Sequence, residues 1–179
     1  AFKAETHLTV KEKITLYKLA FEKKILVEIG SYLGASACCF CAALKDSEYS
    51  NKKVLYCIDT WNNDAMSEGH RDTLIEFKKN TFAFKKFIYT IRGWSTEVTE
   101  ELFGRTSYID LLFIDGDHSY DGVLADWNSY KNFLKKGSLI IFHDYGWALG
   151  VQRVIKEEVL SRVEKTGSLP NMWWGYIKD

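Results

Sequence analysis

Short apolar runs alternate along the chain with longer segments whose apolar residues recur at helical spacing. The short runs have the length and β-branched content of buried strands, and they cover residues 25–29, 54–58, 87–91, 109–114 and 138–142. Helical periodicity predicts helices over residues 8–21, 36–44, 71–81, 123–134 and 151–160. Repeated strand–helix units are typical of a parallel sheet with helices on both faces.

Several boundaries follow from the residues that flank these segments. We expect Lys135, Lys136 and Gly137 to end the helix before the last strand of this series. Ser95 can cap a short helix after the strand at 87–91. The tail, residues 162–178, predicts an antiparallel hairpin that turns at 169–171. At 179 residues, the chain is expected to form one domain over 1–179.

The charge balance narrows the choice of partners. Lys and Arg number 24, and Asp and Glu also number 24, so no basic surface for nucleic acid or for an anionic membrane is expected. The longest uncharged run, 29–44, is too short to cross a bilayer. Four cysteines with apolar neighbours are interpreted as buried thiols, which favours a reducing, cytoplasmic setting. A homodimer is one possible assembly, and a monomer is the other.

The segment VEIGSYLGAS, residues 27–36, forms a strand-to-helix turn with unusual glycine spacing. Dinucleotide sites use G-x-G-x-x-G to bring the backbone against a pyrophosphate. Here the spacing is G-x-x-x-G, and Tyr32 would crowd a pyrophosphate. A ligand with an ammonium group and a carboxylate fits better, with Glu28 facing the ammonium and the amides around Ser36 taking the carboxylate. The alternative is a tight turn with no ligand.

Two further strand ends carry polar residues. Asp59 can accept both ribose hydroxyls of a nucleoside, or it can cap the loop at Thr60. Trp61 can flank an adenine or simply pack in the core. Gly93 to Ser95 can contact an adenine edge, and Ser95 can be a helix cap as well.

The last two strand ends bring together carboxylates and imidazoles. FIDGDHSY contains Asp115, Asp117 and His118, and FHDY contains His143 and Asp144. Adjacent parallel strands lie about 5 Å apart, so the two loops can meet around one divalent cation such as Mg²⁺. Without a metal, His118 or Asp117 could act as a general base. The alternative is a purely structural link between the loops.

In these segments the chain resembles class I S-adenosylmethionine (SAM)-dependent methyltransferases, in particular the catechol O-methyltransferase-like group with its relatives acting on sugars and natural products. VEIGSYLGAS, VLYCIDTW, IRGWS, DLLFIDGDHSY and LKKGSLIIFHDY occur in family order over residues 25–145. The resemblance implies a three-layer α/β/α Rossmann-like sheet of seven strands, mostly parallel with the last strand antiparallel. It also implies SAM as the cofactor and an optional Mg²⁺.

The resemblance and the residue patterns together define a set of candidate site residues. Those expected to contact the cofactor are Glu28, Gly30, Ser31, Tyr32, Gly34, Ser36, Asp59, Thr60, Trp61, Gly93, Ser95, Asp115 and His118. Those expected to hold a metal are Asp115, His143 and Asp144, although metal-dependent relatives carry a carboxylate where His143 stands. The candidate catalytic residues are Asp115, Asp117, His118 and His143.

The expected reaction is methyl transfer from SAM to a hydroxyl oxygen of a small acceptor, such as a sugar, a phenol or a natural product. Trp61, Trp147 and the loop 62–70 are expected to form the acceptor pocket. The alternatives are a nicotinamide-dependent oxidoreductase on a similar sheet and a degenerate SAM-binding module without catalysis. Methylation of nitrogen in nucleic acid is disfavoured by the neutral charge and by the lack of an Asn-Pro-Pro-Tyr-type motif.

Overall fold

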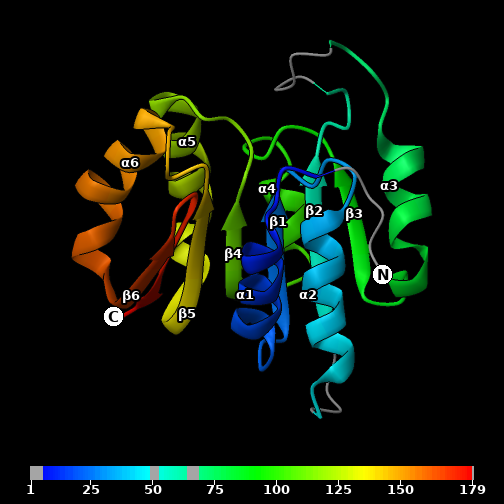
Figure 1. Cartoon of the computed structure of the whole chain (residues 1–179), viewed down its shortest axis with the longest axis horizontal. Coiled ribbons are helices and arrows are strands. Elements are labelled where there is room, and N and C mark those ends of the chain that lie inside the picture. The colour runs from blue at the N-terminus through cyan, green and yellow to red at the C-terminus, as the bar shows by residue number, and fades with distance from the viewer. Residues whose placement is uncertain (1–5, 49–52, 64–68, 179) are drawn as a thin grey trace.

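The computed structural model describes residues 6–48, 53–63 and 69–178, which form one sheet between two layers of helices (Figure 1). The strands are β1 Ile25–Ile29, β2 Val54–Asp59, β3 Ile88–Arg92, β4 Ile109–Ile114, β5 Leu134–His143, β6 Val163–Leu169 and β7 Met172–Ile177. They are ordered β3-β2-β1-β4-β5-β7-β6. β1 to β5 pair in parallel, and β7 runs antiparallel to β5 and β6. The predicted seven-stranded Rossmann-like sheet is confirmed.

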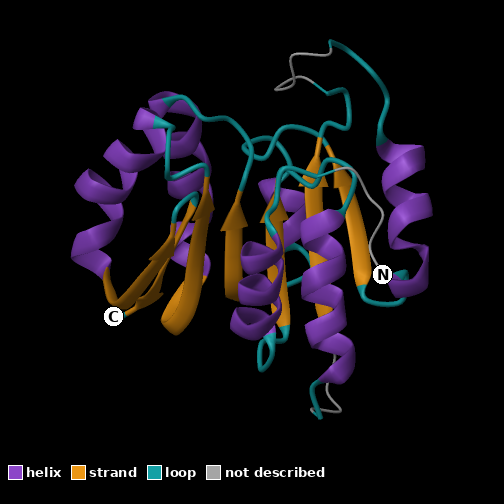
Figure 2. Ribbon diagram, in the orientation of Figure 1, coloured by secondary structure: helices purple, strands orange, loops and turns teal. Residues whose placement is uncertain are grey.

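Helices cover both faces of the sheet, as Figure 2 shows. One layer contains α1 Val10–Ala20, α2 Ala35–Asp46 and α3 Leu74–Thr81, and the other contains α4 Thr99–Phe103, α5 Tyr120–Tyr130 and α6 Leu149–Val154. Short turns extend α3, α5 and α6 through Phe82–Phe84, Lys131–Phe133, and Ile155–Val159 with Leu160–Arg162. None of the helices in the described part of the chain has the length and apolar character needed to cross a membrane.

Each face of the sheet has its own buried core because side chains alternate along a strand. In β1, Val27 packs with the α5–α6 layer, and Leu26 packs with the α1–α2 layer. The four cysteines are buried and unpaired, as expected for core thiols. Burial raises the pKa of Cys38 to about 12, which leaves it protonated and unreactive.

The register of the parallel strands aligns their carboxyl ends. Ile29 pairs with Ile58 on one side and with Ile114 on the other, and Ile114 pairs with Phe142. The next residues of all four strands therefore emerge along one edge of the sheet. The strand order reverses between β1 and β4, which is where ligands bind in sheets of this type.

One predicted boundary is wrong. Lys135, Lys136 and Gly137 do not end a helix, because α5 stops at Tyr130 and β5 already begins at Leu134. The cause is an irregularity in the β4–β5 pairing between Ile109 and Leu111, where Gly137 takes a φ of 83°. The Ser138 hydroxyl closes this bulge by donating to the Ile109 carbonyl at 2.6 Å and accepting from the Lys135 amide at 2.9 Å. The glycine therefore serves a bulge rather than a helix end.

Gly30 allows β1 and β4 to approach each other where their ends meet. Its φ is 84°, and a Cβ placed there would lie 2.0 Å from the carbonyl oxygen of Asp115. Gly137 has nearly the same φ, 83°, but no heavy atom lies within 4 Å of a Cβ built on it. An alanine at either position would have a strained left-handed backbone, but only at Gly30 would it also overlap other atoms.

We expect Gly30→Ala to destabilise the fold by about 2 kcal/mol or more beyond the effect of Gly137→Ala, because overpacking against backbone adds to the cost of a left-handed alanine. Chemical denaturation of both variants measures the difference. Equal losses in the two variants would contradict the close approach of β1 and β4.

Candidate functional site

A cavity of about 920 Å³ opens over the carboxyl ends of β1 to β5, at the reversal of strand order. It brings together most of the candidate residues from the sequence. Those that line it are Gly30, Ser31, Tyr32, Gly34, Ser36, Asp59, Thr60, Gly93, Ser95, Asp115, Asp117, His118, His143 and Asp144. Trp147 also lines it. Two candidates, Glu28 and Trp61, lie behind the wall.

The glycine turn is held from β2 by one carboxylate. Asp59 Oδ2 accepts hydrogen bonds from the amides of Ser31 and Tyr32, both at 2.8 Å, and Asp59 Oδ1 accepts from the Trp61 amide at 2.6 Å. Tyr32 has a φ of 43°, a left-handed conformation that tyrosine rarely adopts. Asp59 therefore positions the turn and presents its carboxylate to the cavity.

Glu28 lies beneath the turn instead of lining the cavity. Its Oε2 accepts a hydrogen bond from the Ser31 hydroxyl at 2.6 Å, and its Oε1 is buried without a partner among the described residues. Burial raises the pKa of Glu28 to about 7, against the effect of the Ser31 bond. Glu28 therefore does not contact the cavity itself but is hydrogen-bonded to Ser31, which lines it.

Trp61 belongs to the core and not to the cavity wall. Its ring lies 5.1 Å from that of Phe77, and its Nε1 donates to the Tyr32 carbonyl at 3.2 Å. The indole thus supports the glycine turn from behind. The loop 62–70 lies partly outside the described residues, at 64–68, while Asn63 lines the cavity.

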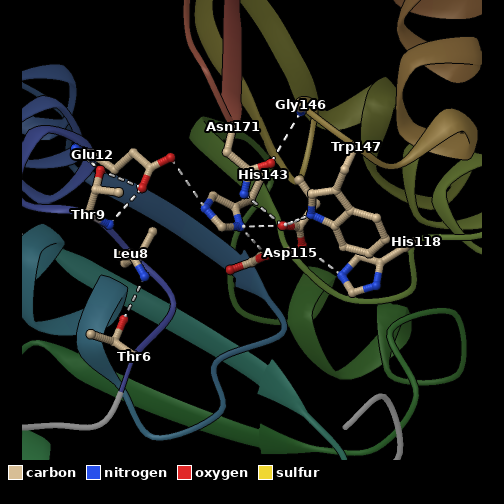
Figure 3. A network of polar contacts seen from close by, with 11 residues as sticks. Thr6, Leu8, Thr9, Glu12, Asp115, His118, His143, Gly146, Trp147 and Asn171 are labelled. Atoms are coloured by element: carbon tan, nitrogen blue, oxygen red, sulfur yellow. Dashed lines mark hydrogen bonds and ion pairs between the residues drawn. The ribbon is translucent and has the colours of Figure 1, made fainter. Parts of the chain in front are cut away.

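Asp144, just after β5, is the centre of a polar network whose other members, His118, His143, Trp147 and Asn171, are labelled in Figure 3. Asp144 Oδ1 lies 2.9 Å from Trp147 Nε1, 2.9 Å from Asn171 Nδ2 and 3.3 Å from His143 Nδ1, and Oδ2 lies 2.7 Å from His118 Nε2. Burial would raise the pKa of Asp144, but these donors hold it well below its usual range. The carboxylate is therefore ionised at neutral pH, with three donors around Oδ1 and one at Oδ2.

His143 sits between carboxylates and is almost fully buried. Its Nδ1 lies 3.1 Å from Asp115 Oδ1, and its Nε2 faces Glu12 Oε1 at 3.7 Å (Figure 3). Burial would lower the pKa of His143, but Asp115 and Asp144 raise it to about 10. Burial in turn raises the pKa of Asp115, which His143 opposes. His143 is thus an imidazolium at neutral pH.

His118 lines the cavity with a more exposed imidazole than that of His143. Its side chain is 32% exposed, and its ring meets the Trp147 ring edge to face with centroids 4.9 Å apart. The hydrogen bond to Asp144 raises the pKa of His118, and burial partly offsets that. Asp117, in contrast, is exposed and accepts from the amide and hydroxyl of Ser119, at the start of α5.

The carboxylates and imidazoles also form a candidate cation cluster. Ligand atoms of Asp115, His118 and Asp144 all lie within 4.8 Å of one another. The sequence proposed His143 as the third ligand, but His143 donates from Nδ1 toward both carboxylates, and the cluster contains His118 in its place.

The other end of the cavity lies after β3. Ser95 does not cap α4, which has Val98 at its N-cap position, so that expectation is wrong. The Ser95 hydroxyl instead donates to Asp126 on α5, and Tyr130 donates to the Ser95 carbonyl at 2.6 Å. These contacts join two segments that are far apart in sequence.

Sequence reasoning missed Glu12, Asp126 and Asn171. Thr9 and Glu12 form a capping box, which the T-x-x-E spacing signals, but that pattern says nothing about proximity to His143. In the sequence, Asp126 is one of several polar residues of an amphipathic helix, and Asn171 is an ordinary turn residue. Only the packing of their elements on the sheet brings Asp126 and Asn171 to the cavity and Glu12 to His143.

Comparison with known proteins identifies the family of this chain and two relatives of similar sequence. A family model described as a methyltransferase domain matches residues 27–145, more than half of the chain. An uncharacterised protein of Acanthamoeba polyphaga mimivirus is 33% identical over 132 residues, which are 70% of this chain and 54% of that protein. An uncharacterised protein of Sinorhizobium fredii is 27% identical over 126 residues, 70% of this chain and 13% of that protein. The chain thus spans only part of both curated relatives.

Solved structures share the fold at low identity. A TDP-rhamnose 3′-O-methyltransferase of calicheamicin biosynthesis aligns with a TM-score of 0.70 and 19% identity, covering 93% of this chain and 78% of its own. The O-methyltransferase TomG from Streptomyces achromogenes, solved with SAM, gives 0.71 and 13%, covering 96% and 82%. An O-methyltransferase from Bacillus cereus, solved with S-adenosylhomocysteine, gives 0.71 and 12%, also covering 96% and 82%.

The charged state of His143 makes a prediction about stability. Because its folded pKa, about 10, exceeds its ordinary value of 6.5, its contribution is complete below about pH 6.5 and is lost as pH rises through about 10. We expect His143→Gln to lower the unfolding free energy at pH 7 and the deficit relative to wild type to shrink by pH 10. Urea titrations at several pH values measure this deficit, and a deficit independent of pH would contradict the imidazolium.

Proposed function

The chain belongs to the methyltransferase-domain family, and from that premise we propose that it transfers the methyl group of SAM to a hydroxyl oxygen of a small molecule. The observation that carries the choice of oxygen is the pairing of His118 with Asp144 at 2.7 Å, in a cavity that also contains the glycine turn. An alcohol or phenol must lose a proton during transfer, and this pair provides an acceptor for it.

The cofactor end of the proposal rests on the glycine turn and Asp59. SAM, when bound, supplies an electrophilic methyl group on sulfonium. The turn from Gly30 to Gly34 gives open space for the amino-acid part of the ligand, and the amides around Ser36 at the start of α2 can take its carboxylate. Three amides occupy acceptor positions of Asp59 as it anchors the turn, which leaves one position on Oδ1 for a ribose hydroxyl. Glu28 contributes through Ser31, which suits an ammonium group nearby.

The proton-accepting end rests on His118. Its Nε2 is bonded to Asp144, so its Nδ1 carries the free lone pair in the neutral tautomer. The acceptor hydroxyl gives its proton to Nδ1 as its oxygen bonds to the methyl carbon and the carbon–sulfur bond breaks. Asp144 orients the ring and stabilises the imidazolium that results. His143 is already protonated, which makes it a fixed positive charge rather than a base.

We propose that the reaction does not require a metal ion, because the carboxylates that could bind one already face hydrogen-bond donors. A carboxylate ligand must present lone pairs to a cation, but the oxygens of Asp144 already face four donors. His143 Nδ1 also lies within 3.3 Å of both Asp115 and Asp144, so it competes with a cation for their oxygens. We therefore assign proton transfer to His118 alone.

The acceptor is proposed to be a small hydroxylated molecule with an apolar or ring-shaped face. Trp147 is 59% exposed at the cavity, and its ring packs against His118. A stacked sugar or phenol would place a hydroxyl next to the base. The solved neighbours named as a TDP-rhamnose 3′-O-methyltransferase and as TomG support this class. A cytoplasmic setting, a single domain and a homodimer stay predictions.

Calorimetry tests the cofactor against the two alternatives. We expect SAM and S-adenosylhomocysteine to bind with micromolar affinity and NAD not to bind, because Tyr32 crowds a pyrophosphate in the turn. Mg²⁺ and EDTA should leave both binding and turnover unchanged. Binding of NAD would support the oxidoreductase, and SAM binding without turnover on any hydroxylated acceptor would support the degenerate module.

Variants of the paired residues test the base. Turnover should rise with pH through the pKa of His118, which the Asp144 bond raises above 6.5, and then level off because the base must be neutral. His118→Gln should lower kcat by about 100-fold or more. Asp144→Asn should lower the plateau and move the rise to lower pH, and asparagine tolerates the φ of 57° found there.

Asp121→Asn is the matched control because it removes an exposed carboxylate in the first turn of α5 that does not line the cavity. It should keep near-wild-type turnover and the same pH profile. A His118→Gln variant that binds the cofactor and retains full turnover would remove the proposed base.

A further inference from the structure

The cavity contains a second buried carboxylate, Asp126, that the proposed transfer step does not use. It lies on α5, is 4% exposed and lines the cavity together with Gly93 and Ser95. No lysine, arginine or histidine pairs with it among the residues that the structure describes. Burial raises the pKa of Asp126 to about 6, the Ser95 bond opposes this, and the Asp117 charge adds to it. A buried carboxylate without a cation calls for another donor.

One oxygen of Asp126 is held in place. Oδ1 accepts the hydrogen bond of the Ser95 hydroxyl, and Tyr130, one helical turn further along α5, donates to the Ser95 carbonyl at 2.6 Å. Two contacts on the same residue fix the loop after β3 against α5. The carboxylate therefore has one orientation, which fixes where Oδ2 points.

Oδ2 lies beside Gly116, in the loop after β4. A Cβ built on Gly116 would be 3.5 Å from Oδ2 and 3.4 Å from Ile29 Cγ2. Both Gly116 and Asp126 line the cavity, and no side chain of residue 116 stands between them. Oδ2 is thus an acceptor next to the space that Gly116 leaves open, in a cavity that Gly93 also lines. Such a space suits a flat ring that carries an N–H group.

The position of Asp59 gives the direction in which a nucleoside would extend. Asp59 ends β2, and the Gly93 amide, at the end of neighbouring β3, donates to the Asp59 carbonyl at 3.0 Å. A ribose at Asp59 would therefore direct its base toward Gly93, Ser95 and Asp126. This step rests on the proposed function, which places SAM in the cavity.

We propose that Asp126 is a specificity-determining residue that accepts a hydrogen bond from the 6-amino group of the adenine of SAM, with Ser95 and Tyr130 holding it in position. A 6-oxo purine would set an acceptor against Oδ2 and lose this bond. A site built to accept from an amino group rejects an analogue that lacks it, because the buried acceptor is left unpaired.

The test compares S-adenosylhomocysteine with S-inosylhomocysteine, which differ at this position of the ring, by calorimetry on the full chain. Wild type should prefer the 6-amino ligand by about tenfold or more. Asp126→Asn keeps an oxygen for Ser95 and places an amide donor where Oδ2 stood, so the preference should fall by at least about tenfold or reverse. Asp121→Asn, an exposed change on the same helix, should keep the wild-type ratio.

Wild type that binds both ligands within about twofold, or a folded Asp126→Asn variant with the wild-type ratio, would overturn the assignment while leaving the proposed function in place. No binding of S-adenosylhomocysteine to wild type would instead defeat the proposed function and this inference with it.

If Asp126→Asn fails to fold, Gly116→Ala replaces it, since its added methyl makes only ordinary contacts. That methyl occupies the space beside Oδ2, so an unchanged affinity for S-adenosylhomocysteine would overturn the assignment.

Discussion

The backbones of β1 and β4 meet at Gly30 and Asp115 so closely that no side chain fits between them. The Asp115 amide donates to the Ile29 carbonyl at 2.9 Å, and the Gly30 amide donates to the Ile58 carbonyl at 3.0 Å. These bonds hold three strand ends together at the reversal of strand order. Because the strands are in register, this contact also sets where Asp59 and His143 emerge. The positions of the other site residues follow from it.

Buried charge is the second constraint on the molecule. Isolated carboxylates or imidazoliums are costly in a protein interior, whereas groups with several partners are tolerated. Asp144 meets this condition by facing four donors from three segments, and His143 meets it by lying between Asp115, Asp144 and Glu12. The same arrangement gives the two histidines different environments, since His143 is enclosed and charged at neutral pH, whereas His118 is partly exposed at the cavity.

The two ends of the cavity are built differently. At the His118 end, loops after β4 and β5 meet the turn between β6 and β7 through Asn171. At the other end, α5 holds the loop after β3 through Asp126 and Tyr130. A ligand that spans both ends would be oriented by loops that follow different strands of the sheet. Such positioning is what methyl transfer requires.

The sequence by itself determined the parallel sheet, the antiparallel tail and the strand ends that carry the site, because periodicity and glycine spacing are local properties. It could not place Trp61 in the core, exclude Ser95 as a helix cap or find Asp126, since each depends on a partner far along the chain. It also could not distinguish His118 from His143. Only the tertiary structure decided that, because burial and the number of surrounding carboxylates set each pKa.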